Sequence, residues 1–205
     1  GKAIVNSVAY SLQYLKRVVW ELYQDPKQIL SFEGVVFEGS DNVVSIEPTY
    51  GMYEVCANIN DVEYRKVLLD DKFDFDADSL LGACDENTKV IFVCSPNNPT
   101  GKLMSREELR NVLSHCLDKG ITVVLDECFI EFCGKERSML QEIDNFPNLI
   151  IVRAFTKIFS IPGARLGYLV CSNQLLLEKI DRQLPEWNIS IFAQAAGVEC
   201  AVQKS

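Results

Sequence analysis

Four short runs of β-branched and aliphatic residues alternate with helical patterns along this chain, and this alternation constrains the fold more than any other feature. The runs are VVSIE (43–47), KVIFVC (89–94), ITVVLDE (121–127) and LIIVRAF (149–155). Runs of this length are typical of strands that are buried on both faces. Because helices separate them, we predict an α/β fold with a mostly parallel sheet flanked by helices.

The clearest helical pattern lies between the second and third runs. In SREELRNVLSHCLDKG (105–120), Ser105 is the predicted N-cap, Glu108 completes a capping box three residues later, and Gly120 ends the helix. Shorter helices are predicted over 49–59, 77–85 and 172–184.

The two ends of the chain also have helical character. Between Ile4 and Leu22, apolar residues recur at steps of three and four, which predicts an amphipathic helix over 4–23 rather than a secretory signal. No run is long and apolar enough to span a membrane. We therefore interpret residues 1–205 as one domain, with an atypical helical region over 1–36 and a C-terminal helix over 185–205.

Charge and cysteine content exclude several classes of function. The formal net charge of −9 argues against a nucleic-acid partner, which requires a basic face. The eight cysteines are scattered through apolar runs without a CxxC pair, and His115 is the only histidine. This pattern predicts no metal site, and it favours reduced thiols in a cytoplasmic protein.

Polar residues follow three consecutive predicted strands. SPNNPTG (95–101) follows the second run, Asp126 and Glu127 end the third, and Arg153 to Lys157 belong to or follow the fourth. In parallel sheets ligands bind beyond the carboxyl ends of the strands. We therefore predict that these side chains meet at a pocket.

The segment RAFTKIFSIPGARLGY (153–168) places two cations, Lys157 and Arg165, among apolar and small residues. Together, SPNNPTG, VVLDECFIEF and RAFTKIFSIPGARLGYLV resemble the large domain of fold-type I pyridoxal-phosphate enzymes. Within that group the chain is most similar to histidinol-phosphate aminotransferases and threonine-phosphate decarboxylases. The resemblance runs from about residue 37 to the C-terminus, so we expect the large domain without the small C-terminal domain.

The resemblance implies that pyridoxal 5'-phosphate is the cofactor, and it gives the two cations separate roles. Lys157 would form a Schiff base with the cofactor aldehyde and move the substrate's α-proton, and we expect its side chain to be buried among apolar neighbours. Arg165 would bind the cofactor phosphate, helped by the Thr156 hydroxyl. From the residues alone, a surface lysine at Lys157 and a buried ion pair at Arg165 remain alternatives.

Further positions match the same family. Asp126 would face the pyridine nitrogen, Asn98 would donate to the cofactor's 3′ oxygen, and Tyr50 would stack on the ring. Phe129 occupies the position of a tyrosine that bonds the 3′ oxygen. A turn aspartate, a plain NNPTG turn and a core tyrosine remain alternatives for Asp126, Asn98 and Tyr50.

Gly39 and Ser40 resemble a phosphate-binding segment that the family places at a helix start. Here NVVSIEPTY follows at once, without the family's long helix.

We therefore expect an aminotransferase of the histidinol-phosphate type, which transfers an amino group between an amino acid or amino-alcohol phosphate and a keto acid. The resemblance also implies a homodimer. Decarboxylation of the phosphothreonine type is the first alternative. A truncated or engineered cofactor-binding domain without turnover is the second.

Overall fold

The predicted strands lie side by side in one seven-stranded sheet, with the order β1-β7-β6-β5-β4-β2-β3. The structure, a computed structural model, describes residues 6–8, 40–181 and 189–203. The four predicted runs are its central strands, β2 (Asn42–Glu47), β4 (Thr88–Cys94), β5 (Thr122–Asp126) and β6 (Leu149–Ala154). Neighbours among these four pair in parallel, which confirms the mostly parallel sheet.

Two strands escaped sequence analysis because neither carries a long apolar run. The edge strand β3 (Glu63–Leu68) has the sequence EYRKVL and pairs in parallel with β2. At the other side of the sheet, β7 (Gly167–Val170) has four residues and runs antiparallel to β6. The sheet is therefore mixed at one side.

The helix predicted over 4–23 is wrong where the structure describes it. Residues Asn6–Val8 form the strand β1, which pairs antiparallel with β7. The free edge of β7 offers main-chain donors and acceptors, and their pairing outweighs a local helical periodicity. The remainder of 4–23 lies outside the described residues.

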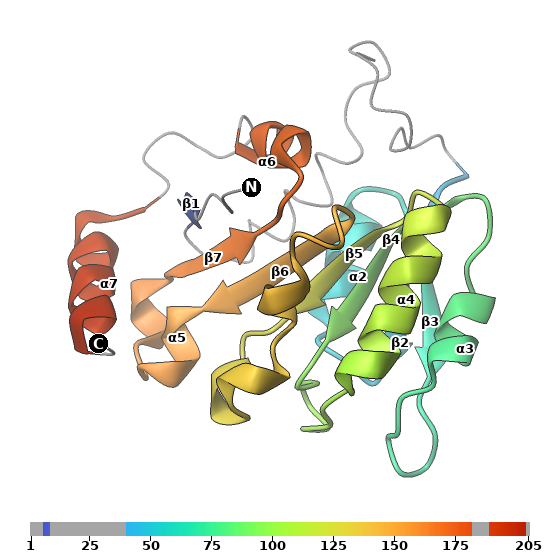
Figure 1. Cartoon of the computed structure of the whole chain (residues 1–205), viewed down its shortest axis with the longest axis horizontal. Coiled ribbons are helices and arrows are strands. Elements are labelled where there is room, and N and C mark those ends of the chain that lie inside the picture. Colours follow the sequence, from blue (N-terminus) through green and yellow to red (C-terminus); the bar gives the residue numbers. More distant parts are fainter. Residues whose placement is uncertain (1–5, 9–39, 182–188, 204–205) are drawn as a thin grey trace.

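Helices cover both faces of the sheet (Figure 1). On one face, α2 (Met52–Ile59) and α6 (Gln174–Asp181) pack on an apolar cluster that includes Phe92 and Ile150. On the other face, α3 (Ala77–Gly82) and α4 (Arg106–Asp118) cover a second cluster, which includes Ile91. The one-turn helix α5 (Phe155–Ile158) and α7 (Ile191–Gln203) lie at the end of the sheet that holds β7 (Figure 1). The described residues also form four short 3-10 helices: η1 (Ile130–Phe132), η2 (Lys135–Arg137), η3 (Met139–Glu142) and η4 (Pro162–Ala164).

The predicted ends of α4 are confirmed. The Ser105 hydroxyl accepts the Glu108 N–H at 3.1 Å, and the Glu108 carboxylate accepts the Ser105 N–H at 2.8 Å. Gly120 follows the helix with a φ of +70°, a left-handed conformation that glycine adopts without a steric penalty.

The structure tests two expectations from composition: the state of the cysteines and the absence of a membrane-spanning helix. All eight cysteines are free thiols, and Cys56, Cys94, Cys116 and Cys171 are buried, whereas Cys133 is exposed. The predicted position of thiols in the core is confirmed for those four. Among the described residues, no helix combines the length and the apolarity that crossing a bilayer would require.

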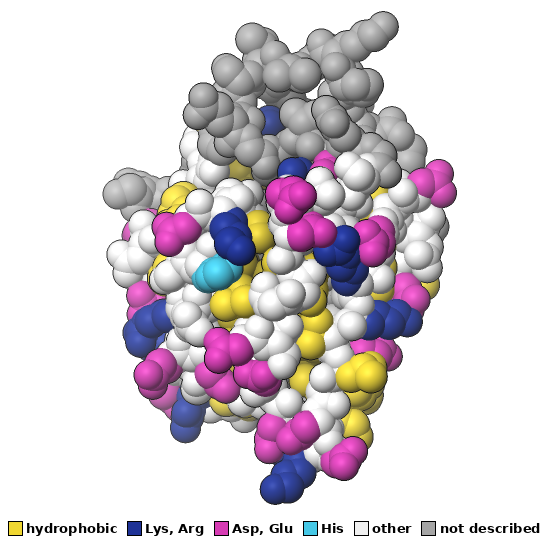
Figure 2. All heavy atoms as spheres, turned by 90° about the vertical axis from the view of Figure 1, so that its right-hand side faces the viewer, with side chains coloured by type: hydrophobic (Ala, Val, Ile, Leu, Met, Phe, Trp, Pro, Cys, Tyr) yellow, Lys and Arg dark blue, Asp and Glu magenta, His cyan; other side chains and the backbone are white. Residues whose placement is uncertain are grey.

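Charged side chains near β3 and α3 pair locally. On the face shown in Figure 2, acidic and basic side chains are interspersed rather than gathered by sign. Lys66 pairs with Glu54 at 2.8 Å, and Lys102 pairs with Asp74 at 2.6 Å. Such exposed pairs contribute little to stability individually.

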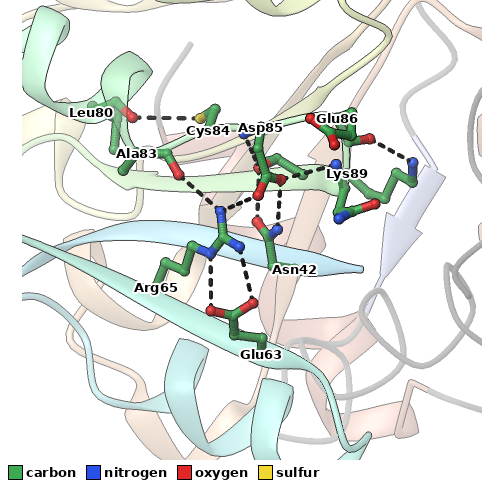
Figure 3. A network of polar contacts seen from close by, with 11 residues as sticks. Asn42, Glu63, Arg65, Leu80, Ala83, Cys84, Asp85, Glu86 and Lys89 are labelled. Atoms are coloured by element: carbon green, nitrogen blue, oxygen red, sulfur yellow. Dashed lines mark hydrogen bonds and ion pairs between the residues drawn. The ribbon is translucent and has the colours of Figure 1, made fainter. Parts of the chain in front are cut away.

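One denser polar network joins the amino ends of three strands (Figure 3). Asp85, just before β4, accepts hydrogen bonds from Asn42 at 2.9 Å and from Arg65 at 2.6 Å. Arg65 of β3 also binds Glu63, and Thr88 donates to the Asn42 side chain at 2.8 Å. The hydrogen bonds from Asn42 and Arg65 hold the pKa of the Asp85 carboxyl well below its ordinary value.

We predict that Asp85→Asn lowers the thermal unfolding midpoint at pH 7 by roughly 2–4 °C. The pKa of Asp85 is lower in the folded chain than in the unfolded chain. Its charge therefore stabilises the fold above the ordinary pKa of 3.8. This contribution begins to fall as the pH drops toward that value and is lost fully only below the lower pKa of the folded chain. Thermal melts of both proteins between pH 7 and pH 3 should show a difference that shrinks with acidification.

Asp71→Asn is the matched control, because Asp71 is exposed and lies outside this network. A difference between Asp85→Asn and the wild type that stays constant across this pH range would contradict the ionic role.

Candidate functional site

The register of the parallel strands brings the predicted site residues to one edge of the sheet. Cys94 pairs with Asp126, and Asp126 pairs with Val152, so β4, β5 and β6 end together. β7 begins at the same edge, because Gly167 pairs with Ala154. The strand-end site is defined as the residues that lie on this edge: Tyr50, Asn98, Asp126, Phe129, Thr156, Lys157 and Arg165.

Asp126 is the buried carboxylate of the strand-end site. Its side chain is held from two sides, because Oδ1 accepts the Cys128 N–H at 2.9 Å and Oδ2 accepts the Tyr53 hydroxyl at 2.8 Å. The hydrogen bond from the Cys128 N–H is typical of an aspartate in a turn, which was the alternative role for Asp126. Each carboxylate oxygen has a second lone pair, so acceptor capacity remains for a ligand.

Tyr53 belongs to this arrangement, and sequence analysis missed it. Its ring is fully buried, stacks on Phe92 with 4.9 Å between centroids, and meets Tyr50 edge-on at 5.5 Å. A signal was present, because Tyr53 lies three residues after Tyr50 and that spacing places both side chains on one side of a helical turn. An apolar segment of this kind nevertheless predicts a core helix before it predicts a site residue.

Tyr50 lies between the core and the site. Its half-buried ring packs on the apolar cluster that contains Phe92. Burial raises its pKa, the negative charge of Asp126 raises it further, and the positive charge of Arg165 opposes the change. Tyr50 is therefore within electrostatic range of both groups. Tyr50 can therefore be a core tyrosine and also contact a ligand at the strand-end site.

Lys157 is exposed, so the expectation that its side chain is buried is wrong. The helix α5 has a single turn, and that turn buries Thr156 while Lys157 faces solvent. The ammonium of Lys157 lies 5.5 Å from the centroid of the Phe129 ring, a distance at which a cation and an aromatic face attract. The amine is therefore accessible at the carboxyl edge of the sheet.

Arg165 is an exposed cation that forms no ion pair with an acidic side chain in the part of the chain that the structure describes. None of the ion pairs formed by the described residues includes it, so the buried-pair alternative is wrong. Its Nη1 donates to the Pro162 carbonyl at 3.2 Å, and its backbone is left-handed with a φ of +51°. The other donors of the guanidinium are available to an anion.

Asn98 and its neighbour Asn97 have different positions in the loop after β4. Asn97 is buried, and its side chain accepts from Thr49 at 2.7 Å and donates to the Pro48 carbonyl at 2.9 Å. Asn98 is half-buried and lies next to this anchor. Nothing in the paired letters NN distinguishes the two, so sequence analysis missed the structural role of Asn97.

Ser40 is not brought to the strand-end site. It is exposed and lies in a turn directly before β2, at the amino edge of the sheet. The six residues of β2 separate it from the carboxyl edge, a span of roughly 20 Å at about 3.3 Å per residue. Without an intervening helix the chain cannot return to that edge. Gly39 lies outside the described residues.

Glu127 and Arg153, also predicted at strand ends, neutralise each other. Glu127 Oε2 lies 2.8 Å from Arg153 Nη2, and the Glu127 carboxylate also accepts from Ser138 at 2.8 Å and from the Met139 N–H at 2.7 Å. Burial lowers the pKa of Arg153, but the charges of Glu127 and Tyr168 and the hydrogen bonds to them together outweigh burial, so the pKa is raised. The pair of buried Glu127 and half-buried Arg153 anchors the start of η3 through Ser138 and Met139, which is a structural role.

A cavity of about 170 Å³ lies beside this pair. Asp126, Lys157 and Arg165 do not line it, and its main charges already satisfy each other. We therefore place the candidate site at the strand-end residues rather than in this cavity. The cavity is lined by Glu127, Cys128, Glu131, Arg153, Ala154, Phe155, Ile158, Phe159, Tyr168, Cys200 and Ala201.

Comparison with known proteins identifies the family. Residues 28–203 match the family described as aminotransferase class I and II. The chain is 47% identical over 172 residues to the histidinol-phosphate aminotransferase of Bacteroides fragilis (strain YCH46), an alignment that covers 83% of this chain and 48% of that protein. The chain thus spans about half the length of the curated relatives it matches.

Two solved structures are similar to this chain to different degrees. The histidinol-phosphate aminotransferase from Clostridium acetobutylicum has a TM-score of 0.82 and 28% identity, covering 97% of this chain and 54% of that chain. The L-threonine-O-3-phosphate decarboxylase from Porphyromonas gingivalis has a TM-score of 0.69 at 20% identity, covering 92% and 50%, and shows likeness of fold alone. With its family match over most of its length, the chain belongs to the class I and II aminotransferases.

Proposed function

We propose that this chain is the cofactor-binding part of a pyridoxal 5'-phosphate-dependent aminotransferase of the histidinol-phosphate type. It would act in the transfer of an amino group between an amino acid or phosphorylated amine and a keto acid. The observation that carries the proposal is the placement of Lys157, Asp126 and Arg165 on one edge of the sheet. The 47% identity to a histidinol-phosphate aminotransferase supports the substrate class.

The chemistry of the strand-end site fits this cofactor. A phosphorylated aldehyde with a basic ring nitrogen needs an amine, a carboxylate and a cation. Lys157 supplies an accessible amine and Asp126 a carboxylate with acceptor capacity. Arg165 supplies a guanidinium that no carboxylate of the described residues neutralises. The donor set is therefore complete for all three parts of the molecule.

When bound, the cofactor would supply an electron-withdrawing ring that stabilises negative charge at the substrate's α-carbon. The Lys157 amine would bind the aldehyde carbon and carry the α-proton. Asp126 would hold a proton on the ring nitrogen, while Arg165 and the Thr156 hydroxyl would bind the phosphate.

The remaining strand-end residues would position the ring. Tyr50 would pack against one face, and the Asn98 amide would donate to the 3′ oxygen. Phe129 contributes an apolar wall, since it lacks the hydroxyl of a tyrosine.

Amino transfer is favoured over decarboxylation by the relatives. Those at 38–48% identity are histidinol-phosphate aminotransferases. Phe129 is the feature that favours the decarboxylase. Two parallel incubations, one with histidinol phosphate and a keto acid and one with phosphothreonine, separate the two reactions when their products are measured by mass spectrometry. A new amino acid supports amino transfer, and release of carbon dioxide from phosphothreonine supports the alternative.

A homodimer in the cytoplasm is part of the same proposal. The free thiols support a reducing compartment. Helix α7 exposes Ile191, Phe192, Val198 and Val202, and the Phe192 side chain is 84% exposed. Apolar surface of this kind is usually covered in solution, most often across a two-fold axis.

We predict that Lys157→Ala abolishes covalent attachment of the cofactor without unfolding the chain. After incubation with pyridoxal phosphate and reduction with borohydride, peptide mapping should find the adduct on Lys157 in the wild type. In the variant the adduct should fall to about a tenth or less, because the reacting amine is gone.

Lys102→Ala is the control for this experiment, since Lys102 is another exposed lysine and pairs with Asp74. Equal labelling of wild type and Lys157→Ala would show that Lys157 is not the attachment site. An absence of specific labelling in the wild type would sink the cofactor proposal itself.

Arg165→Gln should weaken binding of pyridoxal phosphate by roughly ten- to a hundredfold, the cost of losing hydrogen bonds between charged groups. Binding of pyridoxal, which has no phosphate, should be unchanged, because Arg165 would contact only that group. Equilibrium dialysis with both compounds makes the comparison. Arg137→Gln removes another exposed arginine and should match the wild type. An equal loss for both compounds would contradict phosphate binding by Arg165.

Sedimentation equilibrium at micromolar concentration should give a dimer, and Phe192→Ser should shift it toward monomer, because a polar side chain replaces an exposed aromatic one. Phe132→Ser is the control, since Phe132 is exposed on η1 instead of α7. A monomeric wild type that binds the cofactor would exclude the dimer while leaving the cofactor site in place.

A further inference from the structure

The hydroxyl of Tyr53 is one of two donors that fix the Asp126 carboxylate. It donates to Oδ2 at 2.8 Å, and the Cys128 N–H donates to Oδ1 at 2.9 Å. The two bonds reach different oxygens, so together they define the rotation of the carboxylate plane. The Cys128 amide is part of the same turn as Asp126, whereas Tyr53 comes from helix α2 on a separate segment.

Tyr53 is itself held rigidly. Its ring is fully buried and lies nearly parallel to Phe92, with an interplanar angle of 8°. Phe92 belongs to β4, the neighbour of the strand that ends at Asp126. The position of the Tyr53 hydroxyl is therefore fixed by helix α2 and by the contact with Phe92 of the sheet. The hydroxyl has little freedom to follow a rotation of the Asp126 carboxylate.

The hydroxyl also remains a donor throughout the ordinary pH range. Burial raises the pKa of Tyr53 well above its usual value, and the negative charge of Asp126 raises it further. A neutral tyrosine hydroxyl next to an ionised carboxylate forms a charge-assisted hydrogen bond, which is stronger and shorter than a neutral one. This bond is buried, so water does not compete for it.

We propose that Tyr53 is a positioning residue that orients the Asp126 carboxylate toward the ring nitrogen of the bound cofactor. The inference rests on the proposed cofactor site. It adds a residue that does not touch the cofactor but determines the direction from which Asp126 does. Without the hydroxyl, Asp126 would keep one anchor and could rotate away from the ring nitrogen.

The test is a double-mutant cycle on the full chain with pyridoxal phosphate as the ligand. Tyr53→Phe keeps the ring and its stacking but removes the donor. We expect its dissociation constant for pyridoxal phosphate to rise about tenfold, the effect of losing one charge-assisted hydrogen bond. The pH at which the visible absorbance of the bound cofactor changes should also shift, in the same direction as in Asp126→Asn.

In the Asp126→Asn background, Tyr53→Phe should have little further effect, because the hydroxyl acts through the carboxylate. Tyr64→Phe is the matched control: its half-buried hydroxyl interacts with Ser45, away from the strand-end site. It should leave both the affinity and the absorbance profile unchanged.

The outcomes separate the two levels of the proposal. If the wild type does not bind pyridoxal phosphate, the proposed function fails. If the wild type binds it but Tyr53→Phe has the same affinity and the same absorbance profile, the positioning role is overturned. If Tyr53→Phe and Asp126→Asn have additive effects on affinity, Tyr53 acts on the fold and not through Asp126, which also overturns it. Thermal melts of each variant show whether the fold is retained.

Discussion

The hydrogen-bonded register between β4, β5 and β6 is the constraint on which the rest of the structure depends. Cys94, Asp126 and Val152 lie in one row across three strands. Every loop that leaves these strands therefore starts from the same edge. A shift of one residue in β5 would turn Asp126 to the opposite face, where Glu127 now pairs with Arg153. Side chains along each strand point alternately to the two faces of the sheet, and both faces are buried. This alternation fixes the register and thereby the strand-end site.

Because side chains alternate between the two faces of the sheet, the neighbouring carboxylates Asp126 and Glu127 have different surroundings. Asp126 and Glu127 are adjacent in sequence, yet among the described residues only Glu127 forms an ion pair, with the half-buried Arg153. Asp126 is held by an amide and a hydroxyl, which restrict its orientation without neutralising its charge. A paired charge in the interior anchors a loop, whereas an unneutralised carboxylate can act on a ligand. Arg165 is the complementary case of a cation that no carboxylate in the described part of the chain neutralises.

The amino edge of the sheet has a different organisation. There Asp85, Asn42 and Arg65 satisfy one another across β2, β3 and the residues that precede β4. These contacts tie strands that are far apart in sequence, and they leave little capacity for a ligand. This difference between the two edges agrees with the general behaviour of parallel sheets. Ligands bind at the carboxyl ends of the strands, and contacts at the amino ends stabilise the fold. Ser40, which lies at this edge, is accordingly separated from the site residues.

The sequence by itself determined the central strands, the capped helix α4 and the common edge of the polar residues that follow three consecutive strands, such as Asn98, Asp126 and Lys157. These features rest on local patterns: apolar runs, a capping box, and polar residues directly after strands. Tertiary structure alone decided the rest. Asn6–Val8 became a strand because β7 offered a free edge, and β3 became a strand by pairing with β2 despite its charged residues. Lys157 is exposed because of the direction of a single turn, and Tyr53 reaches Asp126 across 73 positions of sequence. No local pattern encodes such contacts, because the energy that selects them comes from groups that only the folded chain brings together.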